Sequence, residues 1–167
     1  MRAGDYRCGI PVDRLREVVK RGKVTRIPEA KAPFRGLLCL RGEVVTVLDL
    51  AALVATAGRG ASAQETTGTT TGGIRPQRVE SVVILRGGRD ALGLEVDGVE
   101  EIRELPPCEG GPAAPGSPRA RGGIWAGAVQ DGATEVGVLD PDRLFASAEA
   151  LAGAVQEPVV EEVPNRG

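Results

Sequence analysis

Residues 9–18, with the sequence GIPVDRLREV, and residues 93–102, with the sequence GLEVDGVEEI, share one frame. Each stretch runs Gly, aliphatic, any residue, Val, Asp, any residue, aliphatic, any residue, Glu, aliphatic. Both halves of the chain also close alike, with Val-Leu-Asp followed four residues later by Leu53 or Leu144. A repeat on this scale indicates two copies of one supersecondary unit, too long for a solenoid period. Two similar modules side by side create a groove, which favours binding over catalysis.

Short apolar runs between turn signals predict that the chain is mostly β. Residues 37–40 and 44–48 flank Arg41-Gly42-Glu43, which indicates a hairpin with glycine free to adopt a positive φ. In the second half, the Asp97-Gly98 pair predicts a hairpin that is followed by a strand at 99–105. Short strands joined by tight turns favour small barrels.

Helices are expected to be few. A short turn of helix is expected at 33–36. Asp140 followed by Pro141 is typical of an N-cap with proline at the first helical position, so we expect an amphipathic helix at 141–155. Gly137 is expected to weaken the last strand or to mark a bulge.

The expected organisation is one domain at 1–155 with two subdomains. The first subdomain is expected at about 1–56 and the second at about 78–145, because residues 57–77 are rich in Gly, Thr and Ser and lack a core-forming period. The acidic tail at 156–167, which contains two prolines, is expected to be flexible.

Composition argues against several classes of function. The 167 residues carry a formal net charge of -2 and only 2% aromatic residues, which disfavours nucleic-acid binding. The sequence has no histidine, and its three cysteines are widely spaced, so neither a catalytic base nor a metal site or cofactor is expected. No apolar run is long enough to span a membrane and no signal peptide is evident, which predicts a cytoplasmic protein.

The repeat also predicts a gap in the first module. A full strand, 81–85, precedes Gly93, whereas only residues 1–7 precede Gly9. The first module is therefore expected to lack its first strand, which would leave an unpaired edge. Two explanations stand beside each other: a start codon assigned too far downstream or a shortened chain, and a gap filled by a strand from a partner or from the other module.

Residues 34–50, FRGLLCLRGEVVTVLDL, resemble the signature of the CheW-like domain family, the chemotaxis coupling proteins, in which an aromatic and a glycine lead into an LRG hairpin and a VxDL strand. The two decapeptides resemble the family's two Gly-aliphatic-x-Val units, and residues 138–144 resemble its closing LLDPxxL. The pieces stand in the family's order and cover nearly the whole chain.

The resemblance implies an all-β fold of two SH3-like β-barrel subdomains that share a core, with a C-terminal helix. It also implies a non-enzymatic adaptor at membrane-associated receptor arrays, which binds the cytoplasmic tips of chemoreceptors and the regulatory domain of a CheA-type histidine kinase. No membrane insertion is implied. The partner-binding positions that the resemblance implies are Glu17, Gly36, Arg41, Gly42 and Gly93, and the alternating aliphatic pattern adds Val18, Val96 and Val99.

The residues alone support this interpretation in part. An alternating frame would place one aliphatic floor for a receptor helix on a single face: Val12, Leu15, Val18, Val96, Val99 and Ile102. Without the family, Arg41 is interpreted as a solvated turn arginine and Glu17 as an outward-facing strand residue. The alternatives are a CheW-like module of a two-component pathway unrelated to motility, an enzyme or ligand-binding barrel, and a nucleic-acid-binding pair of barrels.

Overall fold

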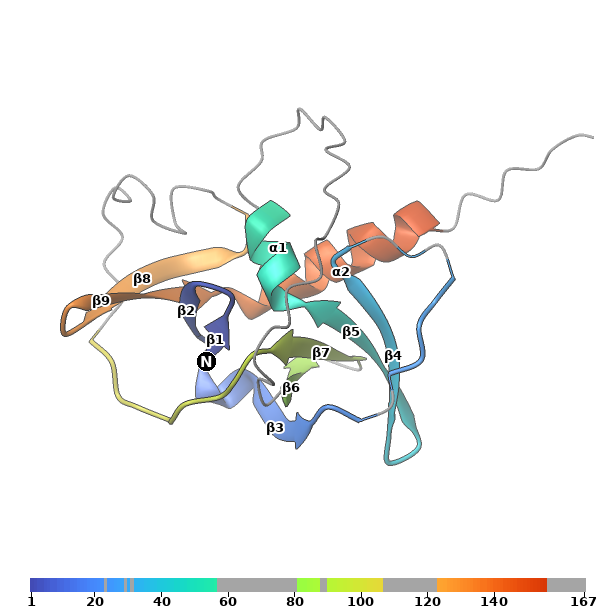
Figure 1. Ribbon diagram of the computed structural model, residues 1–167, viewed down its shortest axis with the longest axis horizontal. Helices are drawn as coiled ribbons and strands as arrows, with labels where there is room; N and C mark the ends of the chain where they lie inside the picture. The colour runs from blue at the N-terminus through green and yellow to red at the C-terminus, as the bar shows by residue number, and fades with distance from the viewer. Residues whose placement is uncertain are drawn as a thin grey trace, which may run out of the picture.

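The computed structural model describes residues 1–22, 24–28, 30, 32–56, 81–87, 90–106 and 123–155. Its strands form two sheets, with two short α-helices packed against them (Figure 1). In chain order the elements are β1 (Arg2–Ala3), β2 (Tyr6–Gly9), the 3-10 helix η1 (Val12–Arg14), β3 (Leu15–Lys20), β4 (Phe34–Leu40), β5 (Glu43–Asp49), α1 (Leu50–Thr56), β6 (Ser81–Gly87), β7 (Asp90–Val96), β8 (Trp125–Asp131), β9 (Thr134–Leu139) and α2 (Pro141–Val155).

Each sheet draws strands from both halves of the chain. The five-stranded sheet has the order β3-β6-β7-β5-β4, and the four-stranded sheet has the order β1-β2-β9-β8. The parallel pairs β5–β7 and β2–β9 join the halves within each sheet. Two β subdomains are thus present, as expected, but the expected division at 1–56 and 78–145 does not describe them. The sequence repeat marks the two halves of the chain, whereas the hydrogen bonds interleave these halves.

The five-stranded sheet curls into a barrel. The chain that follows β3 returns to β4, where Thr25 and Leu37 exchange both backbone hydrogen bonds at 2.8 Å. This contact joins the two edges of the sheet and leaves fewer unpaired backbone groups there. The closure is possible because Gly36 lies directly beneath Thr25: a Cβ atom on Gly36 would come within 2.1 Å of the Thr25 carbonyl oxygen.

The buried apolar side chains form two clusters. The larger one lies between the sheets and includes Leu48, Leu94, Trp125 and Leu139, all at most 5% exposed. A smaller cluster fills the interior of the barrel and consists of Leu38, Val45, Val47, Val82 and Ile84. The larger cluster contains side chains of both sheets, so the two subdomains share one core.

The repeated Val-Leu-Asp segments each end a strand and begin a helix. The Asp49 carboxylate accepts a hydrogen bond from the Ala52 amide at 3.0 Å, and the Asp140 carboxylate accepts bonds from Asp142 and Arg143 at 3.0 and 3.2 Å. Aspartate at the N-cap satisfies amides that the first helical turn leaves free. The expected helix at the C-terminus is confirmed as α2. The turn of helix expected at 33–36 is wrong, because β4 begins at Phe34 and the additional helix, α1, follows Asp49.

Substituting Asp140 tests the cap of α2. We expect Asp140→Ala to lower the free energy of unfolding by about 1 kcal/mol, because two amides of the first turn lose their acceptor. Urea unfolding followed by circular dichroism measures the change. Asp140→Asn retains a cap acceptor and should lose only a few tenths of a kcal/mol. Equal losses for both substitutions would contradict the cap.

The segment after β7 differs from the prediction. A hairpin at Asp97-Gly98 with a strand at 99–105 was expected, but residues 99–106 form no strand. Instead, the Arg2 amide donates to the Gly98 carbonyl at 2.9 Å, and the Asp97 amide donates to the Arg2 carbonyl at 2.9 Å. These bonds tie the end of β7 to β1 rather than to a following strand. Residues 99–106, hereafter the strap, run as the yellow trace in Figure 1 from β7 past the N-terminus.

Candidate functional site

Glu17 and Arg41, two of the predicted binding residues, form an ion pair. Glu17 lies on β3 and Arg41 lies at the tip of the β4–β5 hairpin, where the curl of the barrel brings the hairpin to β3. The Arg41 Nη2 atom donates to Glu17 Oε2 at 3.2 Å. The Glu17 side chain is 22% exposed and that of Arg41 is 77% exposed. The guanidinium therefore faces solvent, where most of its N–H groups can donate to a partner.

The hairpin turn fixes the position of Arg41. Arg41 and Gly42 both have positive φ values, 52° and 87°, in a two-residue loop between the paired residues Leu40 and Glu43. Such a turn matches the twist of the flanking strands. Gly42 therefore has the conformational role that was expected of it, and nothing lies within 4 Å of a Cβ placed there.

A second arginine completes a charged row beside this pair. Arg16 Nη1 donates to Glu43 Oε2 at 2.6 Å, and Arg16 Nε lies 3.8 Å from Glu17 Oε1. The hydrogen bond to Glu43 is the main cause of a raised pKa for Arg16. Glu17 is thus held between two arginines, and the row presents alternating charges along the edge of β3.

An apolar groove of 380 Å³ lies between β2, β3 and the strap. It contains four of the six residues of the predicted aliphatic floor as exposed side chains: Val12, Val18, Val99 and Ile102, which are 57%, 42%, 44% and 76% exposed. Leu15 also lines the groove. These residues come from both copies of the repeated decapeptide, so the groove between the modules that the repeat predicted is present.

Other predicted binding residues lie inside the protein. Val96 is 3% exposed and belongs to the core, so it does not join the floor of the groove. Gly93 is buried, and a Cβ on it would lie 3.0 and 3.1 Å from methyl groups of Val82 and Val47. Gly36 is buried against the backbone of Thr25. The close approach that these two glycines allow is therefore an approach within the chain itself.

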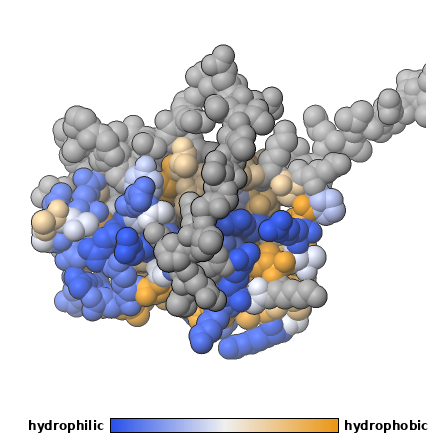
Figure 2. Space-filling view, viewed as in Figure 1, coloured by the Kyte–Doolittle hydropathy of each residue, from blue (hydrophilic) through white to orange (hydrophobic). Residues whose placement is uncertain are grey.

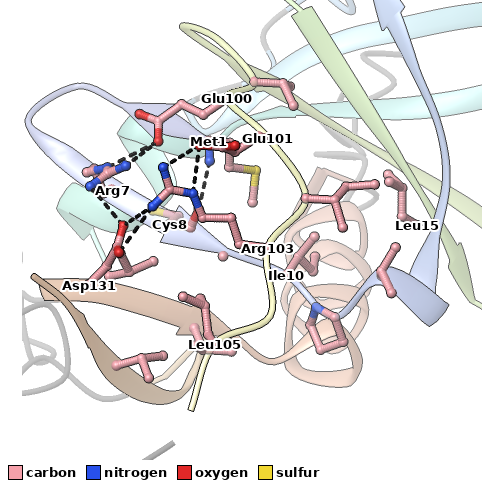
Figure 3. Close-up of a pocket in the computed structure, with 18 of the residues that line it drawn as sticks. Met1, Arg7, Cys8, Ile10, Leu15, Glu100, Glu101, Arg103, Leu105 and Asp131 are labelled. Atoms are coloured by element: carbon pink, nitrogen blue, oxygen red, sulfur yellow. Dashed lines mark hydrogen bonds and ion pairs between the residues drawn. The ribbon is translucent and has the colours of Figure 1, made fainter. Parts of the chain in front are cut away.

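Ion pairs that the sequence analysis did not find secure the strap over the groove. Arg7 on β2 donates to Glu100 Oε2 through Nε at 3.2 Å and through Nη2 at 2.5 Å. Arg103 Nη1 donates to both carboxylate oxygens of Asp131, at 3.1 and 2.9 Å. Figure 3 shows these side chains converging beside Met1. Figure 2 has the same view as Figure 1, and hydrophilic residues cover much of its left part, where Figure 1 labels β8, β9 and β2. No local pattern links residues so distant in sequence, so only a register for the strands could have identified these pairs.

The Arg7–Glu100 pair makes the strap sensitive to acid. The hydrogen bond from Arg7 is the main cause that lowers the pKa of Glu100. Because the folded-state pKa lies below the unfolded value, this pair stabilises the fold above the unfolded pKa of Glu100, and its contribution is lost as the pH falls through the folded pKa.

We expect Arg7→Gln to raise the pKa of Glu100 towards its ordinary value. NMR titration of the Glu100 side-chain carboxyl carbon measures this change. Arg14→Gln, which removes an arginine that pairs with Asp142 in α2, is the matched control and should leave the Glu100 titration in place. An unchanged Glu100 pKa in Arg7→Gln would show that the pair does not form in solution.

Cys8 and the aromatic residues serve the core, whereas the free thiol of Cys39 is exposed. Burial raises the pKa of the Cys8 thiol to about 12, which leaves it protonated and unreactive at neutral pH. Among the described residues, no group of three or more His, Cys, Asp or Glu side chains could hold a metal ion. The four aromatic residues, Tyr6, Phe34, Trp125 and Phe145, all belong to the central core or pack against it, so their rings do not form a base-stacking face.

The model of the CheW-like domain family matches residues 1–149. The chain belongs to the CheW-like domain family. This family consists of non-enzymatic scaffold or adaptor domains. Within this CheW-like chain, 49 residues are 41% identical to Protein FrzA from Myxococcus xanthus, and the match covers 29% of the chain and 31% of FrzA.

The CheW-like fold is also found in a solved structure. Scaffolding protein TtCheW from Thermoanaerobacter tengcongensis matches with a TM-score of 0.60, over 80% of this chain and 77% of that one. At 21% sequence identity, the similarity concerns the fold alone. The expected architecture of two SH3-like β subdomains with a C-terminal helix is confirmed. In the part of the chain that the structure describes, no helix is long and apolar enough to span a membrane.

Proposed function

We propose that this CheW-like chain is a chemotaxis adaptor that couples the cytoplasmic tip of a chemoreceptor to the regulatory domain of a CheA-type histidine kinase. The observation that carries the proposal is the position of the Glu17–Arg41 pair. A positive, solvent-facing fork stands next to β3, whose Val18 forms part of an exposed apolar surface. Family membership supports the scaffold role. The exposed arginine beside an apolar surface supports binding of a receptor helix.

The surface suits an α-helix with a mixed face. A helix that presents apolar residues at i, i+3, i+4 and i+7 could pack on the apolar rim of the groove, which Val12, Val18 and Val99 supply. Arg41 would then reach carboxylates or the terminal carbonyls of the helix, because a guanidinium donates two parallel hydrogen bonds to a carboxylate. Glu17 orients Arg41, and its carboxylate would accept a hydrogen bond from a lysine or arginine of the receptor.

Gly36, Gly42 and Gly93 contribute to binding indirectly in this account. Gly36 and Gly93 permit the barrel to close and pack, and Gly42 permits the turn that presents Arg41. We expect substitutions at Gly36 or Gly93 to reduce binding only together with stability. Binding by the receptor is expected to protect Val18 and Val99 from solvent, and to leave Val96 unaffected because it is buried already.

Arg41→Glu tests the proposal. We expect the substitution to weaken binding of a soluble receptor hairpin about tenfold or more, because it reverses the exposed charge and places a carboxylate beside Glu17. The fold should be intact, since Arg41 is 77% exposed. Isothermal titration calorimetry with the purified receptor fragment measures the affinity, and circular dichroism verifies the fold.

Arg86→Glu is the matched control. Arg86 is an exposed arginine on β6, next to Gly87, which packs against Phe145 of α2, so it lies away from the β4–β5 hairpin. The Arg86→Glu substitution makes the same charge change at a different place and should leave the affinity for the receptor in the wild-type range. If Arg41→Glu binds the receptor hairpin as tightly as Arg86→Glu, the role assigned to Arg41 is wrong.

A further inference from the structure

A β-bulge in β3 lies beside the ion pair of the candidate site. The ladder between β3 and β6 pairs Leu15 with Leu85 and Glu17 with Ile84. At this point β3 therefore has one residue more than β6, and the additional residue is Arg16. Consecutive side chains of a regular strand point to opposite faces, whereas a bulge can redirect one of them.

The bulge brings two consecutive side chains of β3 to the same hairpin. Arg16 Nη1 donates to Glu43 Oε2 at 2.6 Å, and Arg41 Nη2 donates to Glu17 Oε2 at 3.2 Å. Arg16 Nε also lies 3.8 Å from Glu17 Oε1. Two carboxylates, one from β3 and one from the β4–β5 hairpin, therefore share the Arg16 guanidinium.

The Arg16–Glu43 pair is the stronger of the two connections between β3 and the hairpin. Its side chains are 32% and 38% exposed, whereas Arg41 is far more open to solvent and its hydrogen bond to Glu17 is longer. A short hydrogen bond between two charged groups is strong, and an ion pair that is open to solvent contributes little. The Arg16–Glu43 pair can therefore hold the hairpin in place while Arg41 binds another group.

We propose that Arg16 is a positioning residue for receptor binding. It holds the β4–β5 hairpin against β3 through Glu43, so that Arg41 is presented at a fixed place. It also remains beside Glu17 when Arg41 turns from Glu17 to a carboxylate of the receptor helix. This inference rests on the proposed adaptor function and adds to it a residue that acts through Arg41.

The role of Arg16 beside Glu17 follows from the cost of leaving a partly buried charge without a partner. The Glu17 side chain is 22% exposed, so its carboxylate would be poorly solvated if both arginines left it. With Arg16 in place, Glu17 keeps a cation at 3.8 Å after Arg41 has turned away. Without Arg16, Arg41 would be the one arginine of the charged row, and Glu17 would compete with the receptor for its guanidinium.

This exchange also indicates which group of the receptor Arg41 binds. A backbone carbonyl is a weaker acceptor for a guanidinium than a carboxylate is, so a carbonyl would not replace Glu17. An ionised Asp or Glu offers Arg41 a hydrogen bond of the same kind as the one that it gives up. We therefore expect an acidic side chain on the receptor helix at the position that faces Arg41.

The affinities of single and double variants test the proposal. Isothermal titration calorimetry with a soluble receptor hairpin measures the dissociation constants of Arg16→Gln, of Arg41→Gln and of the double variant. We expect Arg16→Gln to weaken binding about three- to tenfold in the wild-type background, and by less than about twofold in the Arg41→Gln background. Arg86→Gln, which removes an exposed arginine of β6, is the matched control and should leave the affinity unchanged in either background.

A measurement on the free protein separates this inference from the proposed adaptor function. Backbone 15N relaxation of residues 40–43 reports on the fast motion of the hairpin tip. We expect Arg16→Gln to increase this motion, because it removes the Arg16–Glu43 pair. Arg41→Gln should leave the motion unchanged, since that pair remains.

Two outcomes would overturn the inference. The first is unchanged relaxation of residues 40–43 in Arg16→Gln. The second is an equal loss of affinity from Arg16→Gln in both backgrounds, because Arg16 would then act independently of Arg41. If the wild-type chain does not bind the receptor hairpin but Arg16→Gln still loosens the tip, the adaptor proposal fails and the positioning of the hairpin by Arg16 stands.

Discussion

Replacing Gly36 by alanine should lower the free energy of unfolding by about 4 kcal/mol, because it combines backbone strain with a steric clash. Gly36 has a φ of 138°, a conformation that residues with a side chain rarely adopt. A Cβ there would also lie 2.1 Å from the carbonyl oxygen of Thr25 and 2.8 Å from its carbonyl carbon. The alanine variant must open the contact that closes the barrel. Urea unfolding followed by circular dichroism measures the loss.

Gly42→Ala is the matched control for this prediction. Gly42 also has a positive φ, 87°, but nothing lies within 4 Å of a Cβ placed on it. Its substitution should therefore cost only the backbone strain, about 1 kcal/mol. If the two variants lose equal stability, the close approach of Gly36 to Thr25 does not exist in solution.

The second large effect is expected at Gly137, on β9 in the other sheet. A Cβ on Gly137 would lie 2.5 Å from the ring of Trp125, which is 5% exposed in the core. We expect Gly137→Ala to lower the free energy of unfolding by about 2–3 kcal/mol, because the rigid indole must shift in a close-packed interior. Trp125 is the chain's single tryptophan, so its fluorescence reports the shift directly.

Gly98→Ala serves as the control for Gly137→Ala. A Cβ on Gly98 meets nothing within 4 Å, so the variant should differ from wild type by no more than about 0.5 kcal/mol. A Gly137→Ala variant with wild-type stability and an unchanged emission maximum would contradict the packing described for Trp125.

The structure refines the prediction that Gly137 weakens its strand or marks a bulge. The register shift lies on the opposite strand, between Trp125 and Gly127, and Gly137 makes room for the indole.

The local structure of this chain could be predicted well where neighbouring residues determine it. The Arg41-Gly42 turn and the Asp140-Pro141 helix start depend on backbone conformation and on capping within a few residues. The sequence analysis missed α1 after Asp49, although Asp49 begins it in the same way as Asp140 begins α2. The repeated Val-Leu-Asp could have indicated both caps.

The arrangement of the strands could not be predicted from the repeat alone. A repeat shows that two units are similar, but it does not show whether their strands pair within a unit or between units. Here the parallel pairs β5–β7 and β2–β9 interleave the halves. The strand predicted at 99–105 fails for a related reason: a pattern in one segment does not show which strand lies beside it, and Gly98 pairs with Arg2 instead of starting a hairpin.

The candidate surface was predicted in part. Glu17 and Arg41 came from the family resemblance and Val18 and Val99 from the aliphatic pattern, and the structure brings each of these two pairs together. Val96 was placed on the surface because it belongs to the same alternating frame. It lies in the core because β7 is a central strand of its sheet, covered on both faces.

The most direct test of the adaptor role is reconstitution from purified components. A chemoreceptor cytoplasmic fragment is immobilised, and the regulatory domain of a CheA-type kinase from the same cell is added with wild-type chain, with Arg41→Glu, or alone. We predict that the wild-type chain retains the kinase domain on the receptor, and that Arg41→Glu binds the kinase domain in solution but retains little of it on the receptor. A wild-type chain that binds neither partner, or that retains no more kinase domain than the receptor does alone, would contradict the account.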